Sequence, residues 1–288
     1  MIIDSHAHYS HSLYDGEFTY LDWQQGEFCI REGNRRLLLE EMAQRGILWS
    51  IEAGTQLEKA EAQLAVAADH QPYLRPALGI HPKHCAHLPP QALEQLHTLA
   101  IRHRPIAIGE TGLDYSMPPE ELDKQAQKEW FIRQIKLAHQ LQLPLILHIR
   151  DAYNDALEIL RQHRHLLHGG VAHCFGSDAS TALACVELGF ALGIGARVLQ
   201  EEPLQQVVAA VPLSALLVET DAPYIRPDIR HLPGTGKQRK KVRNSSLILP
   251  AVMEKIAQLR GEDRAEVEQA IFQNTLRVFR LPEGEGSL

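Results

Sequence analysis

Short apolar runs alternate with longer amphipathic segments along most of this 288-residue chain. Apolar runs of about four to eight residues are typical of buried strands, whereas apolar positions that repeat at i, i+3, i+4 and i+7 are typical of helices. After a first apolar run that begins at Ile2, strands are predicted at 47–53, 73–79, 106–108, 143–147, 170–172, 190–194 and 216–218. Helices are predicted at 37–45, 56–69, 93–103, 121–141, 152–163, 181–188, 203–210, 247–260 and 262–279.

This alternation predicts the fold class. Strands separated by helices imply a parallel sheet, and eight such units favour an α/β fold of the closed (β/α)8 TIM-like barrel type. A doubly wound open sheet is the alternative, but no GxGxxG sequence follows the first predicted strand. Because no linker divides the chain, we expect residues 1–288 to form a single domain.

The segment 9–33 interrupts the alternation. It is rich in aromatic residues, such as Tyr20 and Trp23, and its apolar positions follow no clear period. We therefore expect a long loop inserted directly after the first strand. Such a loop would cover one end of the barrel and restrict what enters it.

The composition narrows the class of protein. A hydrophobic content of 44% is enough for a full-sized core, and no run of about 18 apolar residues indicates a membrane span. The four cysteines form no CxxC pair and the N-terminus does not resemble a secretory signal, so a cytoplasmic location is expected. A net charge of −7 argues against a protein that coats nucleic acid through an extended basic face.

Side chains that can bind a metal follow the predicted strands directly. His6 and His8 end the first strand, and because side chains alternate along a strand they point the same way. The others, at the ends of later strands, are Glu110, His148, His173 and Asp221. In a barrel these ends meet on one face, and four histidines with two carboxylates suit zinc, manganese or a carboxylate-bridged metal pair.

Each of these residues has an ordinary structural explanation when it is taken alone. His148 or His173 could be a hydrogen-bonded core histidine, and Asp221 could cap a helix. Glu110 could be a surface acid, although it follows an apolar run where an unpaired carboxylate would be costly. Together the six residues predict a metal site.

Further polar residues lie just past strand ends and could bind a substrate. His81 and Arg150 are expected to contact phosphate oxygens, Arg150 as a bidentate donor. Lys83 could do the same or could be a solvated loop lysine. Glu219 is placed to orient a metal-binding histidine from outside the ligand set.

A basic loop, 230–245, follows the last predicted strand. Its cations, after Arg230 at its start, are Lys237, Arg239, Lys240, Lys241 and Arg243. A basic run is usually solvated, yet positive charge after a predicted ligand strand of an acidic protein could also contact a phosphate backbone. The sequence leaves both interpretations open.

Several sequence blocks, in this order along nearly the whole chain, resemble the TatD-type metal-dependent hydrolases of the amidohydrolase superfamily. The blocks are Asp4-Ser5-His6-Ala7-His8, Gly79-Ile80-His81-Pro82, Gly109-Glu110-Thr111-Gly112-Leu113-Asp114-Tyr115, Leu143-Pro144-Leu145-Ile146-Leu147-His148-Ile149-Arg150-Asp151-Ala152, His173-Cys174-Phe175 and Glu219-Thr220-Asp221-Ala222-Pro223-Tyr224. Asn274-Thr275 and Phe279 are similar to the C-terminal helix of that family. The 9–33 segment and the basic loop depart from the family pattern.

The resemblance implies a distorted barrel that binds two divalent metal ions, zinc, manganese or magnesium, and cleaves DNA. It assigns His6, His8 and Asp221 to the first metal, His148 and His173 to the second, and Glu110 to both. Asp221 and Glu110 would then be the catalytic residues, with Asp221 accepting a proton from the attacking water.

The expected function is therefore metal-dependent cleavage of DNA or of another phosphodiester substrate. Hydrolysis of a small ester, lactone or amide is the alternative, because relatives in the superfamily use the same metals on carbonyl groups. A non-enzymatic, metal-bound assembly component is a further alternative, against which the complete set of six ligands argues.

Overall fold

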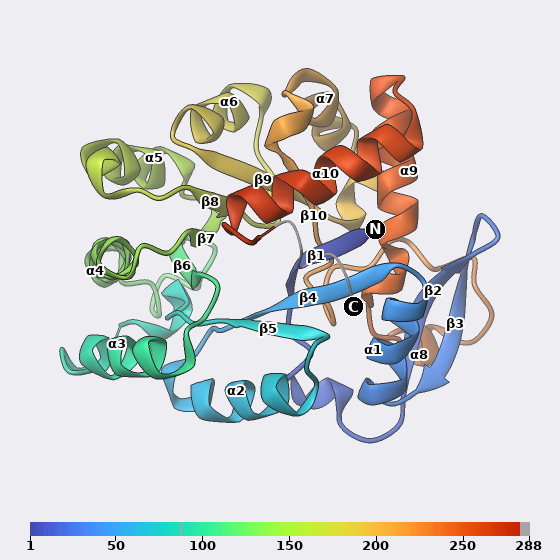
Figure 1. Ribbon diagram of the computed structural model, residues 1–288, viewed down its shortest axis with the longest axis horizontal. Helices are drawn as coiled ribbons and strands as arrows, with labels where there is room; N and C mark the ends of the chain where they lie inside the picture. The colour runs from blue at the N-terminus through green and yellow to red at the C-terminus, as the bar shows by residue number, and fades with distance from the viewer. Residues whose placement is uncertain (87, 283–288) are drawn as a thin grey trace.

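Eight parallel strands form the centre of the computed structural model, which describes residues 1–86 and 88–282 (Figure 1). They pair in two sheets. The first contains, in spatial order, β1 (Ile2–Ala7), β4 (Ile47–Ala53) and β5 (Leu74–Ala77). The second contains β6 (Ile108–Asp114), β7 (Leu145–Arg150), β8 (Gly170–Ala172), β9 (Phe190–Ile194) and β10 (Leu216–Val218).

Isolated backbone bridges join the two sheets at both edges. Leu78, just after β5, pairs with Ile108 of β6, and Ala7 of β1 pairs with Ala222, just after β10. The order of neighbours therefore returns from β10 to β1, which gives the TIM-like barrel that the alternation predicts. The barrel is distorted, because a continuous ladder exists only within each sheet.

Most of the helices lie outside the barrel (Figure 1). The α-helices are α1 (Arg35–Gln44), α2 (Ala60–Asp69), α3 (Ala92–His103), α4 (Lys124–Leu141), α5 (Tyr153–Gln162), α6 (Ala179–Glu187), α7 (Glu202–Ala210), α8 (Gly236–Arg239), α9 (Leu249–Arg260) and α10 (Arg264–Val278). Asp123, Asp178 and Asp263 accept hydrogen bonds from backbone N–H groups in the first turns of α4, α6 and α10, and so fix where these helices begin. Within 1–86 and 88–282, the helices are too short or too polar to cross a membrane.

The interior of the barrel is filled by apolar side chains and closed at one end by α10. Ile3, Ile146 and Leu217 belong to the cluster of buried residues that fills the interior. Phe272 and Leu276 of α10 pack against this cluster, and Figure 1 shows α10 crossing the strands. Ile3 and Ile146 are each the second residue of their strand, and α10 contacts β1 and β10, so α10 closes the N-terminal end. The C-terminal ends are left for polar residues.

Shortening a buried side chain of the closing helix, α10, is expected to destabilise the whole barrel. Phe272→Ala should lower the free energy of unfolding by about 3 kcal/mol, because its side chain is 3% exposed and its removal leaves a cavity. Leu37→Ala is the matched control, since that side chain is 55% exposed and should change the free energy by about 0.5 kcal/mol or less. Urea unfolding measures both, and equal effects would contradict the role assigned to α10.

The expected loop at 9–33 is wrong for most of that segment, which folds as a β-hairpin. β2 (Phe18–Gln24) pairs antiparallel with β3 (Glu27–Gly33). Gln25 and Gly26 connect them with φ values of 52° and 85°, and positive φ at both positions is the mark of a type I′ turn. Phe18, Tyr20 and Trp23 all lie in β2, and Phe18 and Tyr20 are buried.

The hairpin lies beside the basic loop 230–245. The N–H of Leu21 donates to the carbonyl of Arg243, and the hydroxyl of Ser245 donates to the carbonyl of Leu21. In Figure 1 both strands of the hairpin stand next to α8. The two segments that depart most from the expected family pattern therefore support each other.

Candidate metal centre

The first two predicted ligands, His6 and His8, come from the end of β1. Both side chains are buried, and their Nε2 atoms are 3.2 Å apart. His8 Nδ1 lies 3.0 Å from the carbonyl of Ala53 at the end of β4. A carbonyl only accepts, so Nδ1 carries the proton and His8 Nε2 presents a lone pair.

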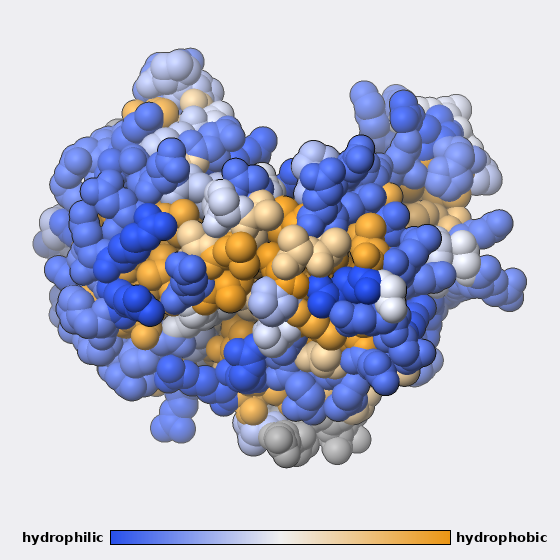
Figure 2. Space-filling view, turned by 90° about the horizontal axis from the view of Figure 1, so that it is seen from above, coloured by the Kyte–Doolittle hydropathy of each residue, from blue (hydrophilic) through white to orange (hydrophobic). Residues whose placement is uncertain are grey.

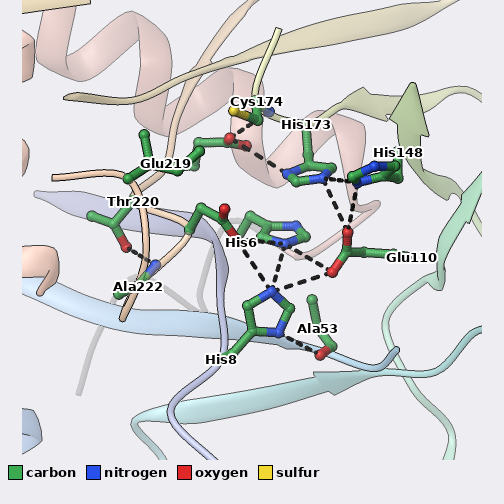
Figure 3. Close-up of polar contacts among 12 residues, drawn as sticks. His6, His8, Ala53, Glu110, His148, His173, Cys174, Glu219, Thr220 and Ala222 are labelled. Carbon is green, nitrogen blue, oxygen red and sulfur yellow. Dashed lines mark hydrogen bonds and ion pairs between the residues drawn. The ribbon is translucent and has the colours of Figure 1, made fainter. Parts of the chain in front are cut away.

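One oxygen of Glu110 and one of Asp221 face the same point, as Figure 3 shows for Glu110. His8 Nε2 lies 3.2 Å from both Glu110 Oε1 and Asp221 Oδ1. His6 Nε2 lies 3.3 and 3.6 Å from these atoms. Ligands about 2.1 Å from a tetrahedral metal are separated by roughly 3.4 Å, so this first cluster (His6, His8, Glu110 and Asp221) has the spacing of a metal site.

The other oxygen of Glu110 belongs to a second cluster, formed with His148 and His173. Glu110 Oε2 lies 3.2 Å from His148 Nδ1 and 3.0 Å from His173 Nε2, and these two nitrogens are 3.0 Å apart. His173 Nδ1 faces a Glu219 oxygen at 3.7 Å. A proton on Nδ1, on the side of Glu219, would leave the lone pair of Nε2 facing Glu110.

The carboxylate of Glu110 is therefore shared between two groups of donors. It is 2% exposed, and Oε1 has no hydrogen-bond partner within 1–86 and 88–282. Burial alone would raise the pKa of Glu110, but the charges of His173 and His6 outweigh it and hold the pKa well below its usual range. A buried, ionised carboxylate between two groups of imidazole nitrogens needs positive charge on both sides to balance it.

The pKa values of His6 and His8 shift in opposite directions. Burial and the neighbouring His173 lower the pKa of His6. Burial also acts against the charged form of His8, but hydrogen bonds with Asp221 and Glu110 raise its pKa well above the usual value. Metal ions would take the place of these protons, so binding should release protons.

Asp4 anchors the first cluster, a role that sequence reasoning missed. Its buried carboxylate accepts hydrogen bonds from the hydroxyls of Thr220 and Ser246, at 2.6 and 2.5 Å, and from the N–H of His6. It therefore ties β1 to the residues beside Asp221. Burial raises the pKa of Asp4 to about 7.

The structure separates the three residues predicted to bind substrate. His81 is buried beside the second cluster, with Nε2 at 3.9 Å from Glu110 Oε2. Arg150 is exposed at the end of β7 and lines a cavity. Lys83 instead faces Asp114, with Nζ at 3.2 Å from Oδ2.

Asp114 is a second residue that sequence reasoning missed. The predicted strand ended near Glu110, but β6 continues to Asp114, so Glu110 lies inside the strand and Asp114 ends it. The Asp114 carboxylate contacts His148 Nε2 at 3.1 Å. Gly112 and Leu113, which precede Asp114 and are buried, continue the strand past Glu110. The apolar Leu113 is the feature of the sequence that could have indicated this longer strand.

A cavity of about 940 Å³ opens beside the two clusters. His148, His173 and Asp221 form part of its wall, and Arg150 and Arg197 contribute cations. None of the lining residues belongs to 9–33, all of which the structure describes, so the hairpin does not line this cavity. Figure 2 shows a notch in the molecular outline between two largely hydrophilic lobes, on the side away from the viewer of Figure 1.

The five cations at 237–243 in the basic loop divide into two kinds. Arg239 donates to the carbonyls of Leu232 and Gly234, and Arg243 donates to the carbonyl of Lys241. These arginines hold the loop together. The exposed cations of this run are Lys237, Lys240 and Lys241.

Comparison with known proteins gives a consistent result. The sequence profile of a family described as TatD related DNase matches residues 3–280. A protein of Yersinia pseudotuberculosis named 3'-5' ssDNA/RNA exonuclease TatD is 32% identical over 241 residues, which cover 82% of this chain and 89% of that protein. The Escherichia coli K12 protein YcfH, named an uncharacterized metal-dependent hydrolase, is 38% identical over 205 residues, which cover 70% of this chain and 72% of that one.

A solved structure shows the same architecture. The crystal structure of YjjV, described as a TatD homologue from Escherichia coli K12, superposes with a TM-score of 0.77 and 28% identity. The superposition covers 98% of each chain. The fold is thus shared with that protein over nearly its whole length.

Proposed function

The chain belongs to the TatD-related DNase family, and we propose that it hydrolyses phosphodiester bonds of single-stranded nucleic acid with two divalent metal ions. Its relatives support metal-dependent hydrolysis, and the name 3'-5' ssDNA/RNA exonuclease of the Yersinia relative favours a single strand cleaved from its 3' end. The observation that carries the two-metal proposal is the division of the Glu110 oxygens between two histidine clusters.

The donor atoms fit two ions of borderline softness. His6, His8 and Asp221 would hold one ion, His148 and His173 the other, and Glu110 would bridge them. Imidazole nitrogens with carboxylate oxygens suit zinc or manganese, whereas magnesium prefers oxygen ligands. The unpartnered Oε1 of Glu110 and the four histidine nitrogens that lie 3.0 to 3.3 Å from its two oxygens support this donor set.

Bound divalent ions supply an activated water and neutralise charge on the phosphoryl oxygens. Asp221 is the residue placed to accept the proton of that water, because its carboxylate belongs to the first cluster and also lines the cavity. Arg150, which has no ion pair in the described part of the chain, would bind the phosphate from the cavity side. The exposed lysines of the basic loop would contact the strand beyond the cleaved bond.

A nuclease assay with purified protein tests this function. We expect zinc or manganese to support release of nucleotides from a 5'-labelled single strand with a free 3' end, with slower release from a blunt duplex. Blocking the 3' end should stop release if cleavage begins there. A panel of esters and lactones is run beside bis(p-nitrophenyl) phosphate as the comparison.

The proposal fails if neither nucleic acid nor bis(p-nitrophenyl) phosphate is hydrolysed with zinc, manganese or magnesium while an ester or lactone is. Loss of nucleic-acid cleavage after addition of a chelator, and its return with added metal, separates metal-dependent hydrolysis from a contaminating metal-independent nuclease.

A further inference from the structure

The carboxylate of Asp114 is fully buried at the end of β6 and each oxygen has its own partners. Oδ1 accepts hydrogen bonds from the N–H and the hydroxyl of Ser116, at 2.9 and 2.6 Å. Oδ2 faces His148 Nε2 at 3.1 Å and Lys83 Nζ at 3.2 Å. One oxygen is therefore committed to a local turn and the other to the metal centre.

The contact with Asp114 determines which nitrogen of His148 can bind a metal. An ionised carboxylate only accepts hydrogen bonds, so Nε2 of His148 carries the proton. Nδ1 is then left with a lone pair, and it is this atom that lies 3.2 Å from Glu110 and 3.0 Å from His173. Asp114 therefore faces the ring nitrogen of His148 that points away from Glu110. Glu219 faces the corresponding nitrogen of His173.

Lys83 is the cation that balances this buried carboxylate. Its side chain is 41% exposed, but its ammonium group turns inward to the same oxygen that faces His148. His81, Asp114 and His148 also form a group of donors close enough for a metal ion. The lysine ammonium already places a positive charge at the aspartate of this group.

The geometry points to Lys83 and Asp114 as positioning residues that hold His148 in the tautomer required by the second metal ion. The lysine then acts on metal affinity and not on substrate binding. This inference rests on the proposed assignment of Glu110, His148 and His173 to a second ion. It replaces the role in phosphate binding that the sequence suggested for Lys83, which is not among the residues lining the cavity.

Metal titration of the full chain, stripped of metal and titrated with zinc alone, tests the inference without any hydrolysis. The zinc equivalent that no longer binds in His173→Ala is the one assigned to the second cluster. For that equivalent, Asp114→Asn should weaken binding by about 10- to 100-fold, as is typical for partners of metal-binding histidines. Lys83→Met should weaken it by about two- to fivefold, because a partly exposed ion pair contributes less, and Lys83→Arg should restore it.

Lys128→Met is the matched control, since it breaks a lysine–aspartate pair with Asp155 at 2.7 Å that does not touch either cluster. Zinc affinity of this variant should equal that of the wild type. At saturating metal, kcat and KM of Lys83→Met for bis(p-nitrophenyl) phosphate should return to wild-type values. A wild-type zinc affinity with a raised KM would make Lys83 a substrate-binding residue and overturn the inference.

A third zinc equivalent bound by Lys83→Met would also overturn it, because the lysine would then be excluding an ion from the group His81, Asp114 and His148. These titrations read metal binding alone. If the protein proves to be no nuclease, the expected changes in zinc affinity still stand or fall by themselves.

Discussion

Replacing Glu110 with glutamine is expected to reduce turnover of a phosphodiester by about 1000-fold or more, because loss of metal-supplied charge stabilisation costs several kcal/mol. Glutamine keeps the size of the side chain but removes its negative charge. The four histidines and Asp221 would then face one another with no bridging carboxylate. Both clusters lose a ligand at once, so both zinc equivalents should weaken.

The measurement combines zinc content with turnover of bis(p-nitrophenyl) phosphate. Thermal unfolding verifies that Glu110→Gln still folds. Glu254→Gln is the control, because Glu254 is exposed on α9 and lies far outside either cluster. Wild-type zinc content together with wild-type turnover in Glu110→Gln would refute the bridging role.

The barrel and the grouping of the candidate metal ligands were accessible from the sequence because they depend on local patterns. The runs at 47–53, 170–172, 190–194 and 216–218 coincide with β4, β8, β9 and β10. Each is apolar because a parallel strand of a barrel is buried on both faces. Once the strands are placed, barrel geometry brings their C-terminal ends together, so residues far apart in sequence are predicted as neighbours.

Contacts set by tertiary packing were not accessible in this way. Asp114 meets Lys83 and His148, 31 and 34 positions away, through a strand that continues past the apparent end of its apolar run. The local sequence Gly109-Glu110-Thr111-Gly112 contains two glycines and two polar residues, which favour a loop by propensity. Burial on the inside of a barrel overrides that propensity.

The contact between the hairpin and the basic loop is a second example of tertiary packing that local sequence patterns do not predict. Tyr20 and Arg243 are joined by a backbone bridge across more than 200 positions. From sequence, a run of five cations predicts a single charged surface. In the structure, however, Arg239 and Arg243 donate hydrogen bonds to backbone carbonyls of nearby loops. The three exposed lysines therefore carry the remaining prediction of contact with a nucleic-acid backbone.

Replacing Asp221 with asparagine is expected to lower kcat by about 100- to 10,000-fold at saturating metal, with KM nearly unchanged. Asparagine retains the shape of the side chain and an oxygen that can face His8, but it does not accept a proton from water. Glu110, His6 and His8 remain to hold an ion. The effect should therefore fall on the chemical step and persist when metal is raised, in contrast to Glu110→Gln.

The matched control is Asp228→Asn, in the same segment after β10, where the carboxylate is exposed and paired with Arg230 at 2.6 Å. Steady-state kinetics with a single-stranded oligonucleotide and with bis(p-nitrophenyl) phosphate, at several zinc concentrations, separate the two possibilities for Asp221. A kcat within tenfold of wild type at saturating zinc would show that another group accepts the proton. Asp221 would then be a metal ligand alone, since the cluster distances that place it beside His8 do not depend on its role as a base.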